Sequence, residues 1–561
     1  MFKRACLAAA LFTASFSATA QSTFESSGLG DIDPWGIGTL SRSEGALPNT
    51  LWANTDTATL NNLFARTSVR SLSPVGRDLV ARAMLSSARR PQGENGDGLL
   101  LRRLDLIKDL GNPELYANFI RQAANVEGVT SPFELSIDQQ FARGNLASAC
   151  STVRAASRTS AYIFNARAVC LALEGEIERA ELALEFARDE ASQDIWFTSV
   201  IGNMAAESKA KTKPKYDSGL TLALSVGAEL PLPENGFTGI HPQLAALLIQ
   251  RTDIPRALRI QTADAAAFSG ALSVDAYREA YRTVPVRIRA LVPTITGETV
   301  VIPEVEDDPD AVNPNAFVNP LDEALQASAD PTIELEEKAR LYNRALMLAR
   351  GDLTRFQMTS ALLLPHINDM RDASLPPQMA ETFAVATIVA GDPGRAGQFI
   401  MRAARPDGQE PDAYMLAWLE GIQIISGEIR ASQASIDVSR RLANSASEGQ
   451  RARAMRMIHG FVMLGAPISL EARAFLAQAS EETLMAGNEL PPGDMLLTDA
   501  ALHSNALGEG VMRAVLLMGR DPAAMNMFDL ARIVTALSDA GLEDMARQLA
   551  LEGIRYHKPK D

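Results

Sequence analysis

The sequence predicts an all-α protein built from helical hairpins. Apolar and small residues recur at helical spacing along most of the 561-residue chain, and few stretches alternate as β-strands require. Aromatic residues make up only 6% of the chain, so Ala and Leu fill most periodic positions and allow helices to approach closely. Glycines interrupt the periodic runs and indicate that one helix ends and the next runs back in the opposite direction.

The clearest hairpin is at residues 161–187 (AYIFNARAVCLALEGEIERAELALEFA). Apolar residues recur up to Leu173, Gly175 breaks the run, and a second amphipathic run begins at Ile177. A glycine can adopt the left-handed backbone conformation that reverses the chain after a helix. This stretch therefore predicts two antiparallel helices that pack against each other.

Five glycines share the spacing of this hairpin. Each is followed by a small residue at position +5, an aliphatic residue at +9 and a small residue at +12. The five are Gly144, Gly175, Gly391, Gly427 and Gly541. The first two lie 31 residues apart, close to the period of about 34 residues in tetratricopeptide repeats. The chain thus resembles the tetratricopeptide-like helical-repeat proteins. This resemblance implies an α-solenoid, whose extended concave face would bind a protein or peptide.

Residues 1–20 have the pattern of a signal peptide. Lys3 and Arg4 precede an apolar run at residues 5–16, and Ala18 and Ala20 mark a small-residue cleavage site. Cleavage after Ala20 predicts export to the periplasm. It removes two of the 53 basic residues and leaves 51 against 68 acidic ones, a net charge of −17. Such an acidic chain disfavours nucleic acid as a partner. No later run of about 20 apolar residues occurs, so we expect no membrane-spanning segment after cleavage.

Four segments are predicted to follow the signal peptide. Residues 21–49 form an irregular N-terminal arm, in which we interpret Trp35 as an anchor on the first helices. Residues 50–292 and 321–561 form an N-terminal and a C-terminal helical-repeat region. Between them, residues 293–320 contain five prolines and a cluster of acidic side chains, which predict a linker. Close carboxylates also suit a calcium ion, but the residue order of an EF-hand loop is absent.

Periodicity also predicts individual helices in both regions. In the N-terminal region they include residues 57–65, 74–87, 99–110 and 113–125. Ser131, Pro132 and Glu134 have the order of a capping serine, a first-turn proline and a capping-box glutamate, which predicts a helix that begins at Pro132. In the C-terminal region the predicted helices are residues 333–349, 353–364, 377–389, 414–425, 449–464, 470–485, 494–507 and 527–537.

The sequence reveals no catalytic, cofactor-binding or metal-binding set. The histidines are isolated from one another, and the chain lacks an H-E-x-x-H motif, a G-x-S-x-G elbow and a phosphate-binding glycine-rich loop. Carboxylates are plentiful, but a sequence does not show which two would face each other across a bond. Arg89, Arg90, Arg102 and Arg103 flank a polar turn, where they would either hold an anionic partner or be solvated.

Cys150 and Cys170 are the two cysteines that remain after cleavage, and they form a candidate disulfide. In the tetratricopeptide-like alignment they lie on adjacent antiparallel helices at similar height, and the periplasm is a compartment where disulfides persist. Closing this loop of about 20 residues would stabilise the fold by roughly 3 kcal/mol in the chain-entropy model. The alternative is a pair of buried, reduced thiols that act as small apolar residues.

Together these observations favour an exported periplasmic scaffold that binds a protein or peptide partner, without a cofactor. That function follows from the repeat class by analogy, because a fold alone does not fix function. Two alternatives stay open: a cell-envelope hydrolase that uses carboxylates, and a structural component of the envelope. A deep pocket that holds two carboxylates about 5–10 Å apart would favour the hydrolase.

Overall fold

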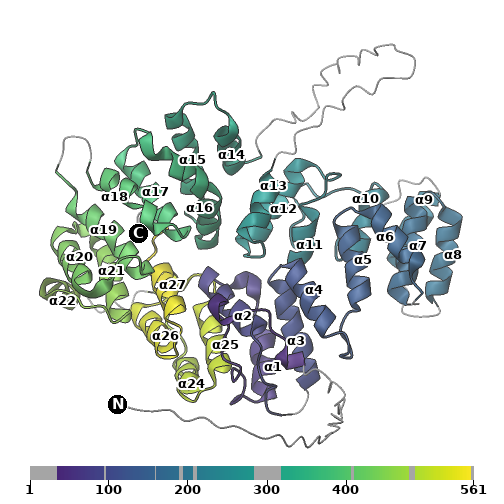
Figure 1. Ribbon diagram of the computed structural model, residues 1–561, viewed down its shortest axis with the longest axis horizontal. Coiled ribbons are helices and arrows are strands. Elements are labelled where there is room, and N and C mark those ends of the chain that lie inside the picture. Colours follow the sequence, from purple (N-terminus) through teal and green to yellow (C-terminus); the bar gives the residue numbers. More distant parts are fainter. Residues whose placement is uncertain are drawn as a thin grey trace, which may run out of the picture. The chain divides into compact units, whose positions relative to one another are not determined.

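Helices dominate the described part of the chain (Figure 1). The computed structural model describes residues 34–93, 96–157, 160–188, 194–205, 212–234, 236–282, 318–405, 410–478 and 487–557. Within these residues there are two isolated β-bridges and no β-strand, which confirms the predicted all-α class. The predicted signal peptide, residues 21–33 of the arm and residues 293–317 of the linker lie outside the described residues.

Of the helices before the predicted linker, those whose bounds the sequence predicts lie close to those bounds. The described helices of this part are α1 (Thr57–Arg66), α2 (Pro74–Leu85), α3 (Gly96–Asp109), α4 (Pro113–Gln122), α5 (Pro132–Ala142), α6 (Leu146–Ala155), α7 (Ala161–Leu173), α8 (Ile177–Arg188), α9 (Ile195–Ala205), α10 (Gly219–Gly227), α11 (Pro242–Leu248), α12 (Arg256–Phe268) and α13 (Val274–Tyr281). Helix α5 begins at Pro132 as predicted, but Ser131 makes no side-chain cap. Glu134 instead accepts a hydrogen bond from Ser160 Oγ (2.6 Å), so it ties α5 to the start of α7.

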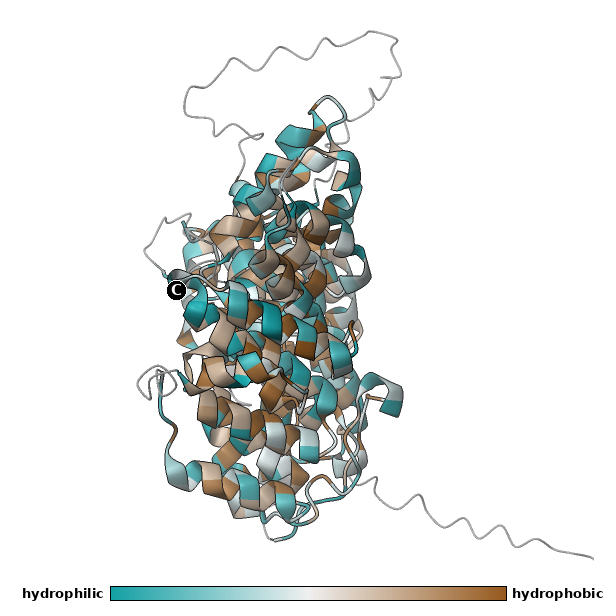
Figure 2. Cartoon of the chain, turned by 90° about the vertical axis from the view of Figure 1, so that its left-hand side faces the viewer, coloured by the Kyte–Doolittle hydropathy of each residue, from teal (hydrophilic) through white to brown (hydrophobic). Residues whose placement is uncertain are grey.

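The helices after the predicted linker are also arranged as hairpins. They are α14 (Pro320–Ala329), α15 (Leu335–Ala349), α16 (Leu353–Asn368), α17 (Pro377–Val389), α18 (Gly397–Ala404), α19 (Ala413–Ser426), α20 (Ala431–Ser445), α21 (Arg451–Met463), α22 (Leu470–Ala477), α24 (Pro492–His503), α25 (Leu507–Met518), α26 (Met527–Asp539) and α27 (Glu543–Gly553). Many of them carry both hydrophilic and hydrophobic residues (Figure 2), as amphipathic helices around a shared core should.

The five turn glycines have the backbone conformation that their pattern predicts. Their φ angles are all positive, between 78° and 91°, a region that a residue with a Cβ atom avoids. Each lies between two helices that pack against each other. At four of the five turns the small residue at +5 is buried, and these residues are Ala149, Ala180, Ala396 and Ala546. At the fifth turn the residue at +5, Ser432, has non-helical backbone angles near the start of α20 and is exposed, whereas Ser439 at +12 is buried.

The N-terminal arm is fixed by a buried arginine. Trp35 is buried, as interpreted from the sequence, and Arg103 lies over its ring. Arg103 donates hydrogen bonds to the backbone carbonyl oxygens of Met84, Ile37 and Ser86, each 2.9 Å long. The anion-binding interpretation is therefore wrong for Arg103, because its guanidinium is enclosed and bonded to the chain's own carbonyl groups.

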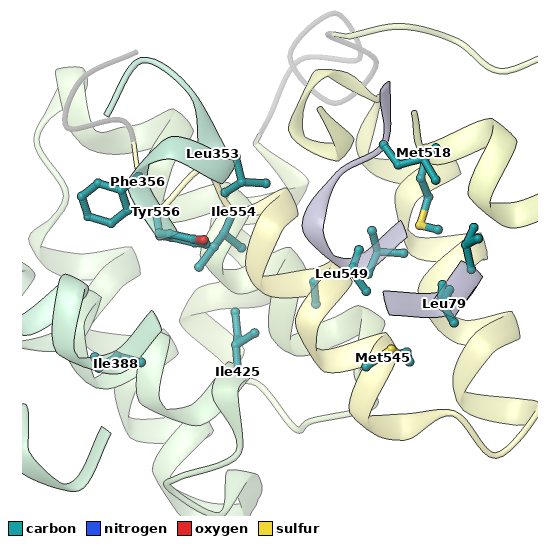
Figure 3. Packing of buried hydrophobic residues seen from close by; sticks show 14 of the residues in the cluster. Leu79, Leu353, Phe356, Ile388, Ile425, Met518, Met545, Leu549, Ile554 and Tyr556 are labelled. Carbon is teal, nitrogen blue, oxygen red and sulfur yellow. The ribbon is translucent and has the colours of Figure 1, made fainter. Parts of the chain in front are cut away.

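Helices from opposite ends of the chain share one core. Helix α2 packs against α25 and α27. Leu79 of α2 belongs to the same buried hydrophobic cluster as Met545 and Leu549 of α27 and Met518 of α25 (Figure 3). The second helix is thus in contact with the last helix, so residues near the two ends of the described chain pack together.

Helices from the two sides of the predicted linker also pack together. Both α12 and α13 contact α16. Arg256 of α12 forms a bidentate ion pair with Asp322 of α14 at 2.5 and 2.9 Å, and Asp322 is fully buried. Nearby, Asp264 of α12 accepts a hydrogen bond from Asn319 Nδ2 (2.8 Å). The two-region organisation stays a prediction, and these contacts imply that the regions would remain attached if the connection between them were cut.

Cys150 of α6 and Cys170 of α7 are joined by a disulfide. Their Cα atoms are 5.5 Å apart, inside the usual range for a disulfide. The two helices are adjacent and belong to successive hairpins. The bond would therefore hold the second helix of one hairpin against the first helix of the next.

Candidate functional site

A cavity of about 200 Å³ lies beside α5, between that helix and its neighbours. Residues of α3, α4, α5, α7 and α11 line it, together with the residues that precede α10. It combines carboxylates, phenols, a lysine and a histidine in one place. Its principal polar and ionisable residues are Lys108, Tyr116, Glu134, Asp138, Tyr162 and His241. The sequence did not single out this group as a site.

Asp138 is the most constrained carboxylate in the cavity. Its Oδ2 atom accepts a hydrogen bond from the backbone N–H of Gly219 (2.9 Å). Its Oδ1 atom accepts one from the N–H of Leu220 (3.0 Å) and one from the hydroxyl of Tyr162 (3.2 Å). Burial raises the pKa of Asp138, and the two N–H donors, the Tyr162 hydroxyl and the charge of Lys108 oppose that rise. Asp138 thus binds the N-terminus of α10, where N–H groups have no partner within the helix.

Because Asp138 holds its N-terminus, helix α10 covers part of the surface of α5 and α7. It packs against α5 and α7, the first helices of two successive hairpins. All of its residues from Gly219 to Ser225 are buried. A Cβ atom at Gly219 would lie 1.9 Å from the carbonyl oxygen of Asp138, so only glycine allows this approach. The surface of α5 and α7 that α10 contacts is already occupied by the chain itself.

Two hydrogen bonds connect α5 to α7 along the wall of the cavity. Glu134 accepts from Ser160 Oγ, and Ser160 also caps α7 by accepting from the N–H of Ile163 (3.2 Å). Tyr162 donates to Asp138 one turn further along α5. Burial, followed by the charge of Asp138, raises the pKa of Tyr162 far above its usual value, so the phenol stays neutral and remains a donor.

His241 is the N-cap residue of α11, and its side chain pairs with Asp109 of α3. Its Nδ1 atom accepts a hydrogen bond from the N–H of Gln243 (3.4 Å), which places the ring proton on Nε2. Nε2 lies 3.1 Å from Oδ1 of Asp109 and donates to it. The imidazole therefore positions the start of α11 and does not face a second metal-ligating side chain. Within the described residues, no group of three or more His, Cys, Asp and Glu side chains is placed to hold a metal ion.

The lining of the cavity is more acidic than basic. Glu134, Asp138 and Asp217 contribute carboxylates, whereas Lys108 is the cation among the residues that line it. Asp217 is exposed and accepts a hydrogen bond from Thr221 Oγ1 (2.7 Å). Lys108 forms no ion pair with another described residue, and it acts on Asp138 through its charge alone. A group that donates hydrogen bonds or carries a positive charge therefore fits this cavity better than an anion does.

The sequence offered only weak signals for this arrangement. Glu134 was singled out as a helix-start residue and His241 only as one of the isolated histidines. The spacing of Glu134 and Asp138 places both on one face of a helix, and Ser218 before Gly219 is a helix-start signal. Neither pattern shows that α10 lies across α5. The candidate disulfide pair, Cys150 and Cys170, is not part of the cavity lining.

In the parts of the chain that the structure describes, no helix combines the length and apolar character that crossing a bilayer needs. A comparison of the sequence and structure with protein-family models, curated proteins and solved structures found no match.

Proposed function

We propose that this chain is an exported, tetratricopeptide-like scaffold that binds a protein or peptide partner in the periplasm. The predicted signal peptide at residues 1–20 supports export, and the stacked hairpins support the scaffold role. The observation that carries the proposal is the open, acidic cavity between α5, α7 and α11. In this proposal the cavity receives one side chain of the partner.

The size of the cavity favours a side chain over a free metabolite. Its volume is about 200 Å³, whereas pockets for small molecules usually measure about 300–1,000 Å³. A single side chain presented by a larger partner needs less space. The remaining affinity would come from the partner's contacts with the surface around the cavity.

The charge of the cavity favours a lysine or an arginine of the partner. One oxygen of Glu134 accepts a hydrogen bond from Ser160, and the other accepts none from a described residue. Asp217, which precedes α10, is exposed and also lines the cavity. A guanidinium or ammonium group would donate to these carboxylates, whereas a carboxylate of the partner would be repelled by them.

An array of random dodecapeptides, probed with residues 21–561, tests this proposal. We expect bound peptides to be enriched in Lys or Arg, and we expect Glu134→Gln to remove the enrichment. Gln keeps the oxygen that accepts from Ser160, so the fold should be preserved. Glu127→Gln is the matched control, because Glu127 is exposed and does not line the cavity. Enrichment of acidic residues, or an equal effect of both variants, would contradict the proposal.

A cell-envelope hydrolase is the second candidate, and one observation favours it. Glu134 and Asp138 are one turn apart on α5 and share a cavity, so their Cβ atoms are about 5–6 Å apart. Asp138 weakens this candidate, since its oxygens already accept three hydrogen bonds. Incubation of the protein with isolated cell-envelope material decides between the two. A hydrolase must release products, and both Glu134→Gln and Asp138→Asn must abolish that release.

A further inference from the structure

Helix α8 carries two large apolar side chains that face away from the core. Leu182 is 54% exposed and Phe186 is 57% exposed. They are one turn apart, so they lie side by side on the same face of the helix. Ala180 and Leu184 of the same helix are buried against the neighbouring helices. Exposure of two adjacent large apolar residues is a mark of an interaction surface when other features accompany it.

Three glutamates flank this apolar pair on one side, and Arg179 lies on the other side. Glu178, Glu181 and Glu185 are all exposed, and none of them forms an ion pair with another described residue. The one arginine of α8 whose side chain is described, Arg179, is paired with Glu176 in the preceding turn. No described cation is therefore paired with any of the three carboxylates. We call Glu178, Glu181, Leu182, Glu185 and Phe186 the α8 ridge.

Among the described helices, only two pack closely against α8. Helix α8 packs against α7 on one side and α9 on the other, at the edge of this group of hairpins (Figure 1). In a repeat protein the terminal hairpin usually has a polar outer face. In the ridge, Leu182 and Phe186 are exposed apolar residues, whereas the three glutamates are exposed and charged.

The negative charge of the ridge favours some binding partners over others. A second copy of this acidic chain would bring carboxylates against carboxylates if the same ridge met itself. An anionic membrane surface would repel the three glutamates. A helix with an apolar stripe and flanking Lys or Arg residues satisfies both features, because it buries Leu182 and Phe186 and neutralises the glutamates.

We infer that the α8 ridge is a docking site for a basic amphipathic helix of a partner protein. The helix lies along α8, with two apolar residues one turn apart against Leu182 and Phe186 and with basic residues opposite the glutamates. This inference rests on the proposed partner-binding function in general, but it uses a surface separate from the cavity at Glu134.

Fluorescence anisotropy with a designed probe tests the inference. The probe is an 18-residue peptide of Leu, Lys and Ala, patterned as an amphipathic helix, and its control is a scrambled peptide of the same composition. We expect residues 21–561 to bind the patterned peptide about tenfold or more tightly than the scrambled one. Binding should weaken as salt is raised, since the ridge attracts the peptide through exposed charges.

Variants separate the ridge from the rest of the acidic surface. The double variant Leu182→Ala/Phe186→Ala should weaken binding by about tenfold or more, and Glu181→Lys/Glu185→Lys should do the same. Leu496→Ala/Leu497→Ala is the matched control, because these side chains of α24 are 66% and 47% exposed. The patterned and the scrambled peptide carry the same lysines, so Glu134→Gln should weaken binding of both alike. The preference for the patterned peptide should persist, which distinguishes the ridge from the cavity.

Several outcomes would overturn the inference. Equal binding of both peptides would show attraction by net charge alone. An equal effect of the α8 and α24 variants would show that the ridge contributes no more to peptide binding than another exposed apolar pair does. A dimer of the free protein that Leu182→Ala/Phe186→Ala dissociates would assign the ridge to a second copy, and binding to vesicles with anionic lipids that the same variant removes would assign it to a membrane.

Discussion

Replacing Glu552 with Gln should remove a pH dependence from the stability of the protein. Glu552 lies on α27 and is only 2% exposed. Its Oε1 atom accepts a hydrogen bond from the backbone N–H of Val75 (2.9 Å), in the first turn of α2. Ser73, Arg77 and Asp521 are the other polar or charged groups that act on this carboxyl group. Glu552 thus links the last helix to the second.

Burial raises the pKa of Glu552 from 4.5 to about 7. The hydrogen bonds from Val75 and Ser73 and the charge of Arg77 oppose the rise, and Asp521 adds to it. Burial likewise lowers the pKa of Arg77 to about 10, so Arg77 stays charged across this range. Between about pH 4.5 and pH 7 the folded chain therefore holds a proton that the unfolded chain has lost.

The sign and the magnitude follow from this difference. Because the folded state binds more protons in this window, the free energy of unfolding falls as the pH rises from about 4.5 to about 7 and then levels off. At about 1.36 kcal/mol per pKa unit, the loss from Glu552 is about 3 kcal/mol. Gln cannot ionise and keeps the oxygen that accepts from Val75. Relative to the unchanged protein, Glu552→Gln should therefore become more stable as the pH rises from 5 to 8.

Urea unfolding followed by circular dichroism at pH 5, 6, 7 and 8 measures this difference. Subtracting the result for the unchanged protein from that for Glu552→Gln at each pH cancels the titration of all other groups. Glu127→Gln is the control, since Glu127 is exposed, and its difference should stay flat. Parallel stability curves for Glu552→Gln and the unchanged protein would refute the reasoning, as would a difference that shrinks with rising pH.

Three further predictions concern the contacts between helices. Alkylation and intact-mass measurement of exported protein should find Cys150 and Cys170 oxidised, and a double Ser variant should lose about 3 kcal/mol of stability; two alkylated thiols would contradict this. Gly219→Ala should destabilise the chain by roughly 1–3 kcal/mol in thermal unfolding, because a Cβ atom there meets α5, and an unchanged melting temperature would contradict the packing of α10. Limited proteolysis within residues 293–320 should give two fragments that elute together in size-exclusion chromatography. The fragments of Asp322→Ala should dissociate at a lower urea concentration than those of the unchanged chain, because the variant leaves Arg256 without its buried partner; dissociation at the same urea concentration would show that the ion pair is dispensable.

The local features of this fold were predictable from the sequence. Gly144 and Gly175 adopt positive φ angles of 78° and 82°, and the helices around them occur where the periodicity places them. Local sterics determine these features, because a glycine needs no tertiary partner to reverse the chain. The pattern failed at Ser432, which has non-helical backbone angles near the start of α20 and is exposed.

The long-range contacts of the polar side chains could be found only from the tertiary structure. Arg103 looked like part of a basic surface, but it is buried against carbonyl groups of the N-terminal arm and α2. Asp138 became a ligand for the N-terminus of α10 because Gly219 approaches α5, 81 residues earlier in the chain. Glu552 meets Val75 across 477 residues. Periodicity shows which face of a helix is apolar, and the partner of that face is fixed by shape and charge complementarity among all the helices at once.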